Sequence, residues 1–367
     1  MKENKTPQIT ARGGQRDSNL ELYRIIAMLL IVAHHYVVNS GLTQGYVTGD
    51  LTNAKDIFAQ LFGAWGKTGI NCFMLITGYF MCTSHITLRK FLKLFGQIYF
   101  WKILIYIVFL LFGIDYLTLK SLVKTLIPIA AVETNFTGCF ILFWLFIPFL
   151  NKVIQNIDKK MHLRLLALSL FIYSFLYFLP GIHVSYNYVS WFIVLYFIAS
   201  YLRLYPLKKD KDTRFWILST FLTILASLSL SAAYMLLTHK GFLWSFLVDS
   251  NAPMAVLVSV CSFMWFKNIK IKQSKLINTI AATTFGVLLI HANSNAMRQW
   301  LWKDTLQNTQ WFQTDYFILH AVLSVIVVFC VCAFLDYLRI KLIERPLMNK
   351  YDSLIQRWSQ RLETSKY

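Results

Sequence analysis

Apolar stretches long enough to cross a bilayer recur along the whole chain, and this recurrence constrains the fold more than any other feature. None of them alternates apolar and polar residues as the strands of a membrane barrel do. Hydrophobic residues occupy 57% of the 367 positions and charged residues only 14%. In water such a chain would expose large apolar patches, so lipid is its expected solvent. The sequence predicts an all-α integral membrane protein.

The hydropathy pattern predicts about ten transmembrane helices with short polar gaps between them. We expect a disordered cytoplasmic tail at 1–19, a membrane domain at 20–345 and a short cytoplasmic C-terminal tail at 346–367. No cleavage site is evident after the polar start, so the first span is expected to remain as an anchor. The predicted spans are 22–40, 56–82, 91–113, 136–157, 163–180, 187–203, 214–238, 251–267, 277–300 and 315–338.

The distribution of basic residues predicts the orientation of the bundle. Of the 36 lysines and arginines, 27 fall in the two tails and in or beside alternate gaps between spans. Segments rich in Lys and Arg stay in the cytoplasm, so both termini are predicted to be cytoplasmic in a multi-pass protein of the plasma membrane. The net charge of +19 therefore reflects topology and attraction to anionic lipids, and it does not indicate a nucleic-acid partner.

Six cysteines lie in or beside apolar segments, without the spacing of a zinc site. We interpret them as small buried hydrophobes and predict neither a metal site nor a permanently bound cofactor.

The first span carries the densest set of ionisable side chains, which are costly inside a bilayer. Glu21 lies three residues before Arg24 and can pair with it on a helix, whereas His35 lies eleven residues after Arg24. Eleven residues return to within about 20° of the same helix face and rise roughly 16 Å, so Arg24 and His35 share a stripe. His34 points about 100° away. The alternative is that Arg24 extends to the interface and that neighbouring helices satisfy the histidines.

Glu21-x-x-Arg24, ten further residues and His35 together resemble the first-helix signature of the membrane-bound acyltransferase-3 family. Other segments are similar to its later helices, and the last two resemble the stand-alone bacterial polysaccharide O-acetyltransferases in particular. Thr77-Gly78-Tyr79 stands where Ser-Gly-Phe is common, and Arg89, Lys90 and Lys93 stand where many relatives have Arg-x-x-Arg. The similar segments are GINCFMLITGYF at 69–80, FILFWLFIPFLNKVI at 140–154, VSWFIVLYFIASYLRLY at 189–205, TFGVLLIHANSNAMRQWLW at 284–302 and DYLRIKLIERPLM at 336–348.

This resemblance implies an O-acyltransferase whose donor substrate is acetyl-CoA or another acyl-CoA from the cytoplasm. The implied acceptor is a hydroxyl of a polysaccharide or a lipid-linked oligosaccharide at the outer side of the membrane. Arg24 with Arg89, Lys90 and Lys93 would hold the nucleotide phosphates while the pantetheine arm reaches toward His35. The alternative is that these lysines belong to ordinary cytoplasmic sequence, and lysine lacks the bidentate geometry of arginine.

His35 is the predicted catalytic residue, because the pKa of imidazole suits proton transfer near neutral pH. It would act as a general base on the sugar hydroxyl, or it would accept the acyl group itself as a covalent acyl-imidazole. The sequence does not separate these two routes.

Several further polar residues are candidates for supporting roles. Asn71 and Thr77 are possible oxyanion donors, although interhelical hydrogen bonds explain both. His291, Asn293 and Asn295, near the outer end of the ninth predicted span, are candidates for acceptor binding or for plain interfacial residues. Glu21 and His34 complete the supporting set.

A glycan transporter or flippase is the main alternative function, since it would also be polytopic with buried polar groups. Paired helix interruptions and internal repeats, which many transporters have, are not evident. The acyl group, the acceptor sugar and the oligomeric state are not specified by the sequence.

Overall fold

The computed structural model describes residues 17–364 except 132–135, 180, 183 and 185, and this part of the chain is helical with no β-strand. The predicted disordered tail therefore lies almost entirely outside the described residues. The helices are α1 Ser18–Val38, α2 Ala54–Gly63, α3 Gly66–Met81, α4 Leu88–Leu111, α5 Leu119–Leu126, α6 Phe136–Asn156, α7 Lys159–Leu170, α8 Tyr188–Leu204, α9 Thr213–Thr238, α10 Pro253–Asn268, α11 Lys275–His291, α12 Asn295–Gln299, α13 Asn308–Phe312, α14 Phe317–Arg339 and α15 Arg345–Thr364.

Five helical segments in the described chain are long and apolar enough to cross a membrane, and α1, α4, α6, α9 and α14 begin them. A sixth results if Lys275–His291 and Asn295–Thr305, which meet at an angle of 94°, form one broken span. The structure is thus consistent with a helical membrane protein, whereas ten spans and cytoplasmic termini stay predictions.

Helix breaks explain why fewer segments qualify than the hydropathy pattern predicts. The expected span at 56–82 is divided into α2 and α3 around Ala64 and Trp65. The expected span at 163–180 passes from α7 into a π-helical turn, Phe171–Phe175, and a 3₁₀ turn, Leu176–Phe178. The helices α8 and α10 have only 17 and 16 residues. A hydropathy window registers apolar content and misses such interruptions.

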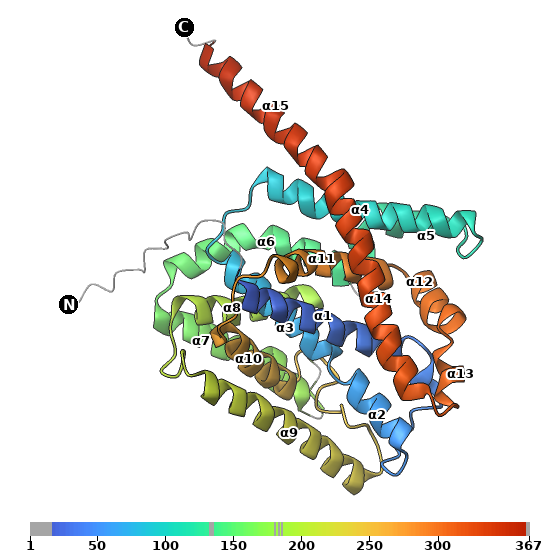
Figure 1. Ribbon diagram of the computed structural model, residues 1–367. Helices are drawn as coiled ribbons and strands as arrows, with labels where there is room; N and C mark the ends of the chain where they lie inside the picture. Colours follow the sequence, from blue (N-terminus) through green and yellow to red (C-terminus); the bar gives the residue numbers. More distant parts are fainter. Residues whose placement is uncertain (1–16, 132–135, 180, 183, 185, 365–367) are drawn as a thin grey trace, which may run out of the picture.

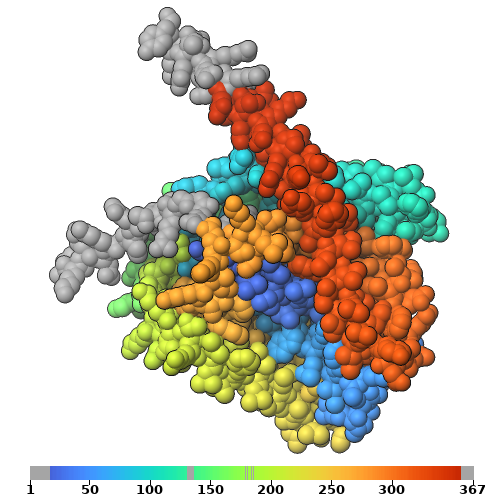
Figure 2. Space-filling view, in the orientation of Figure 1, coloured from blue at the N-terminus to red at the C-terminus, as the bar shows by residue number. Residues whose placement is uncertain are grey.

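The first helix is central to the bundle, as Figure 1 shows. It packs against α2, α3, α10, α11 and α14. On the face shown in Figure 2 it is visible only as a small patch beside α11 and α14. The helix that carries the candidate site residues is therefore surrounded by the rest of the fold.

The end of the chain is a helix, because α14 continues through a π-helical turn, Ile340–Glu344, into α15. In Figures 1 and 2 this last helix projects away from the bundle. Asp336 and Arg339 are buried at the end of α14 and join that helix to α4. Asp336 accepts hydrogen bonds from Arg339 at 2.6 Å and from the Trp101 indole at 2.8 Å. Buried charges require such pairing, so this network fixes the position of α14.

Candidate functional site

The outer end of α1, in the predicted orientation, places His35 against His291 at the end of α11. Nδ1 of His35 lies 2.9 Å from Nε2 of His291. On its other side, Nδ1 of His291 lies 2.6 Å from the carbonyl oxygen of Val287. His291 is fully buried and His35 is partly exposed. The structure thus joins two histidines that the sequence analysis had singled out separately.

The carbonyl of Val287 determines how protons are arranged in this pair. A carbonyl oxygen only accepts, so Nδ1 of His291 carries a hydrogen. In a neutral His291 the Nε2 atom is then an acceptor, and Nδ1 of His35 must donate to it. A neutral His35 therefore keeps an unprotonated Nε2, which has no hydrogen-bond partner within the described part of the chain. This atom can accept a proton or attack an electrophilic carbon.

His34 points away from this pair and joins α1 to the break between α2 and α3. Its Nδ1 donates to the carbonyl of Gly63 at 2.6 Å. A side chain at Gly66 would overlap the His34 ring, so only glycine permits this close approach. The geometry assigns His34 a positioning contact between α1 and the break that follows α2.

Two cations lie close enough to His35 to act on it electrostatically: Lys67 at the start of α3 and Arg298 in α12. Nζ of Lys67 donates to the Tyr188 hydroxyl at 2.8 Å. The sequence analysis had missed both cations because they lie far from His35 in the chain and carry no motif of their own. Positive charge at this position favours an anion that develops beside the imidazole.

Arg24 lies at the other end of α1, as the stripe predicts. Its Nε is 3.9 Å from a carboxylate oxygen of Glu21, and its guanidinium lies 5.7 Å from the centre of the Phe73 ring on α3. The Arg24 side chain is 23% exposed, which leaves part of it accessible to a ligand.

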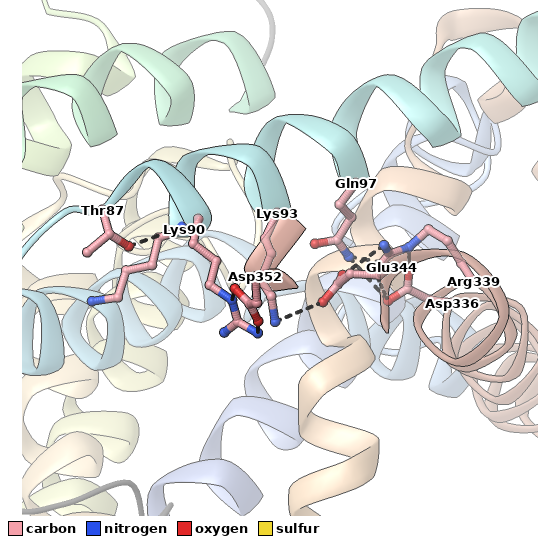
Figure 3. A network of polar contacts seen from close by, with 9 residues as sticks. Thr87, Lys90, Lys93, Gln97, Asp336, Arg339, Glu344 and Asp352 are labelled. Atoms are coloured by element: carbon pink, nitrogen blue, oxygen red, sulfur yellow. Dashed lines mark hydrogen bonds and ion pairs between the residues drawn. The ribbon is translucent and has the colours of Figure 1, made fainter. Parts of the chain in front are cut away.

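The three basic residues at the start of α4 have partners within the chain, and Figure 3 shows Lys93 beside Glu344 of the π-helical turn that precedes α15. Arg89 makes a bidentate pair with Asp352 at 2.9 and 3.0 Å. Lys93 lies 3.3 Å from Glu344, and Lys90 donates to Ser84 and to the carbonyl of His85. These contacts direct Arg89 and Lys93 toward the C-terminal helix.

A cavity of about 650 Å³ nevertheless opens beside these residues, between the starts of α4 and α11 and the end of α14. A hydrogen bond of 3.0 Å from Ser18 to Asn278 connects its wall to the start of α1. Lys275 and Arg345 have no acidic partner among the residues that the structure describes. Its basic lining residues are Lys90, Lys93, Lys275, Arg339 and Arg345.

The remaining candidates are held by the fold. Asn71 is fully buried, donates to the carbonyl of Ser250 at 2.6 Å and accepts from the Trp191 indole at 3.0 Å. Thr77 donates within its own helix to the carbonyl of Phe73 at 2.9 Å. Asn293 donates to two backbone carbonyls and is 9% exposed. Asn71 and Thr77 thus make the structural hydrogen bonds weighed as alternatives, while Asn293 also lines a polar cavity next to His291.

Among the residues that the structure describes, no group of three or more His, Cys, Asp or Glu side chains is arranged to hold a metal ion.

A family model described as an acyltransferase domain, the acyltransferase-3 domain, matches residues 17–337. The match covers most of the chain, so the protein belongs to this acyltransferase family. Searches of curated proteins and of solved structures gave no significant match. The family and the apolar helices together indicate an acyltransferase embedded in a membrane.

Proposed function

We propose that the protein transfers an acyl group, most simply acetyl, from cytoplasmic acyl-CoA to a hydroxyl of a cell-surface or lipid-linked glycan. The observation that carries the proposal is the His35–His291 pair, which leaves Nε2 of His35 ready to take a proton on the family's first helix. This is the reaction of the stand-alone polysaccharide O-acetyltransferases, which the last two similar segments of the sequence resemble.

The donor is assigned to the basic cavity between α4, α11 and α14. Lys275 and Arg345 bring positive charge to this cavity, and the negatively charged phosphates of coenzyme A would balance it. The start of α1 contacts the wall of this cavity. Arg24 and His35 lie along one face of the same helix, with Arg24 nearer the cavity. The pantetheine arm would follow that helix and bring the thioester to the imidazole.

In the direct route, the acceptor hydroxyl gives its proton to Nε2 of His35 as its oxygen attacks the thioester carbon. The new C–O bond forms, the C–S bond breaks, and the proton passes to the leaving thiolate of coenzyme A. The positive charges of Lys67 and Arg298 stabilise the negative charge that develops on the carbonyl oxygen.

In the covalent route, Nε2 of His35 attacks the thioester carbon and releases coenzyme A, and the acyl-imidazole then passes the acyl group to the hydroxyl. Mass spectrometry of protein mixed with acetyl-CoA alone separates the routes. An acetylated His35 supports the covalent route, and an unmodified His35 in a protein that still acetylates glycan supports the direct one.

A cell assay tests the proposal against a transporter or flippase. Cells carrying His35→Ala should export normal amounts of glycan that lacks the acyl ester, while His239→Ala, a change at an exposed outer histidine, should leave the ester in place. Loss of exported glycan in His35→Ala cells would instead indicate transport, and unchanged acylation would contradict the proposal.

A further inference from the structure

A polar cavity of about 240 Å³ lies near the end of α11, the helix that carries His291. Its wall begins with Ala292 and Asn293, the two residues that follow His291, and it is completed by α4, α5 and α12. Arg298 lies on this wall in α12, the short helix that follows His291 after a turn. The cavity therefore lies along the segment that directly follows His291.

Three cations converge on this cavity: Lys102 from α4, Lys124 from α5 and Arg298 from α12. Arg298 and Lys124 both lie close enough to Lys102 for electrostatic repulsion. Lys102 is only 7% exposed, and Nζ donates to the carbonyl of Asn293 at 2.8 Å. In the described parts of the chain it has no acidic partner, although a buried ammonium requires compensation.

The rest of the cavity does not balance this charge. Asp115 is the one acidic residue on the described wall, and its Oδ1 accepts the backbone N–H of Tyr116. Arg298 donates from one terminal nitrogen to Asn295 at 3.2 Å, whereas its buried Nε has no partner in the described structure. Three cations against one carboxylate leave donors available for an anion.

These cations lie on the side of the membrane where the predicted topology leaves few basic residues. On the predicted topology these cations lie toward the outer side, where lysine and arginine are otherwise sparse. The positive-inside pattern that accounts for the basic gaps elsewhere does not account for them.

We propose that this cavity binds a negatively charged group of the acceptor, so that the glycan acylated by this protein is anionic. The group is a carboxylate, as in a uronic acid, or a phosphate, and both suit charge-assisted hydrogen bonds from lysine and arginine. Its contact with Arg298 holds a nearby hydroxyl toward Nε2 of His35. This inference rests on the proposed function, which makes the glycan the acceptor substrate, whereas anion binding itself is tested separately.

Binding to the full-length protein in detergent provides that test. The probes are methyl β-glucuronide, its neutral methyl ester and methyl glucoside 6-phosphate. Arg298→Gln and Lys102→Gln should weaken binding of the preferred anionic probe by roughly 10-fold to 100-fold, with no change for the ester. Lys240→Gln, which removes an exposed outer cation away from the cavity, is the matched control.

The two anionic probes distinguish carboxylate from phosphate acceptors. Equal binding of all three probes, or anion binding unaffected by Arg298→Gln and Lys102→Gln, would overturn the proposal. So would Arg298-dependent stabilisation by phosphatidylglycerol in place of the saccharides, because the cavity would then hold a lipid headgroup.

A transfer assay with acetyl-CoA separates this proposal from the proposed function. Anion binding that depends on Arg298 without any acetyl transfer would leave the site standing and remove the function. Equal transfer to acidic and neutral saccharides would leave the function standing and remove the anionic acceptor.

Discussion

Nδ1 of His35 lies 2.9 Å from Nε2 of His291, although 256 residues separate the two in the chain. Because the carbonyl of Val287 fixes the proton on the far side of His291, the pair holds His35 in the tautomer whose Nε2 is free. His291 thus holds the orientation of the His35 imidazole.

Replacement of His291 tests this positioning role. His291→Ala should lower kcat about 10²-fold to 10⁴-fold, because His35 is then free to adopt the wrong tautomer. His291→Gln should restore part of the rate, since its amide oxygen can accept from Nδ1 of His35. The measurement is kcat of acetyl transfer across pH. A uniform loss in both variants with an unchanged pH profile would indicate that His291 has only a packing role.

The close approach of Gly66 to His34 gives a second prediction. Gly66→Ala should destabilise the protein by about 1–3 kcal/mol and reduce transfer, because the added methyl group displaces the His34 ring. Gly96→Ala in α4 is the control, since its new methyl group meets open space and should be neutral or slightly stabilising. Thermal unfolding in detergent measures both, and equal unfolding temperatures would contradict the prediction.

Two acids on one continuous helical segment should differ in their effect on stability. Asp336→Asn removes one of the two carboxylates that pair with the buried Arg339, while Glu344 stays at 2.9 Å, and it should cost about 1.5–3 kcal/mol. Asp352→Asn breaks a pair whose side chains are 46% and 42% exposed, and it should cost less than about 1 kcal/mol. Thermal unfolding of the two variants at equal protein concentration is the measurement. A larger effect at Asp352 would overturn the assignment of the buried network as the main anchor of α14.

The basic cavity predicts where the donor binds. Lys275→Gln and Arg345→Gln should each raise KM for acetyl-CoA roughly 5-fold to 30-fold with little change in kcat, because each removes a phosphate contact. Lys211→Gln removes an exposed cation elsewhere and should have no effect.

Acetyl-dephospho-CoA adds a sharper comparison at the same cavity. If one of these cations contacts the 3′-phosphate, the corresponding variant should show no further loss with this donor. Equal KM values for the wild type and both variants with either donor would exclude the cavity as the donor site.

The stripe on the first helix is predictable because helical periodicity is local: Arg24 and His35 share a face whatever surrounds them. The family match over residues 17–337 confirms the acyltransferase class, while the donor, the acceptor and the role of His35 stay predictions.

Contacts between distant segments could not be predicted from a single sequence. Arg89 pairs with Asp352 of the predicted C-terminal tail, and Lys93 pairs with Glu344 at the end of the predicted membrane domain. Arg298 reaches the site because the chain bends by 94° after α11, within what hydropathy presents as one span. Tertiary packing, and no local pattern, brings these groups together.

One measurement tests the role of His35 most directly: transfer of labelled acetyl from acetyl-CoA to the de-O-acetylated surface glycan of the same cells by purified protein. Wild type and His239→Ala should label the glycan in an alkali-labile linkage, and His35→Ala should not, at matched amounts of folded protein. Undiminished labelling by His35→Ala would contradict the assignment of the chemistry to this imidazole.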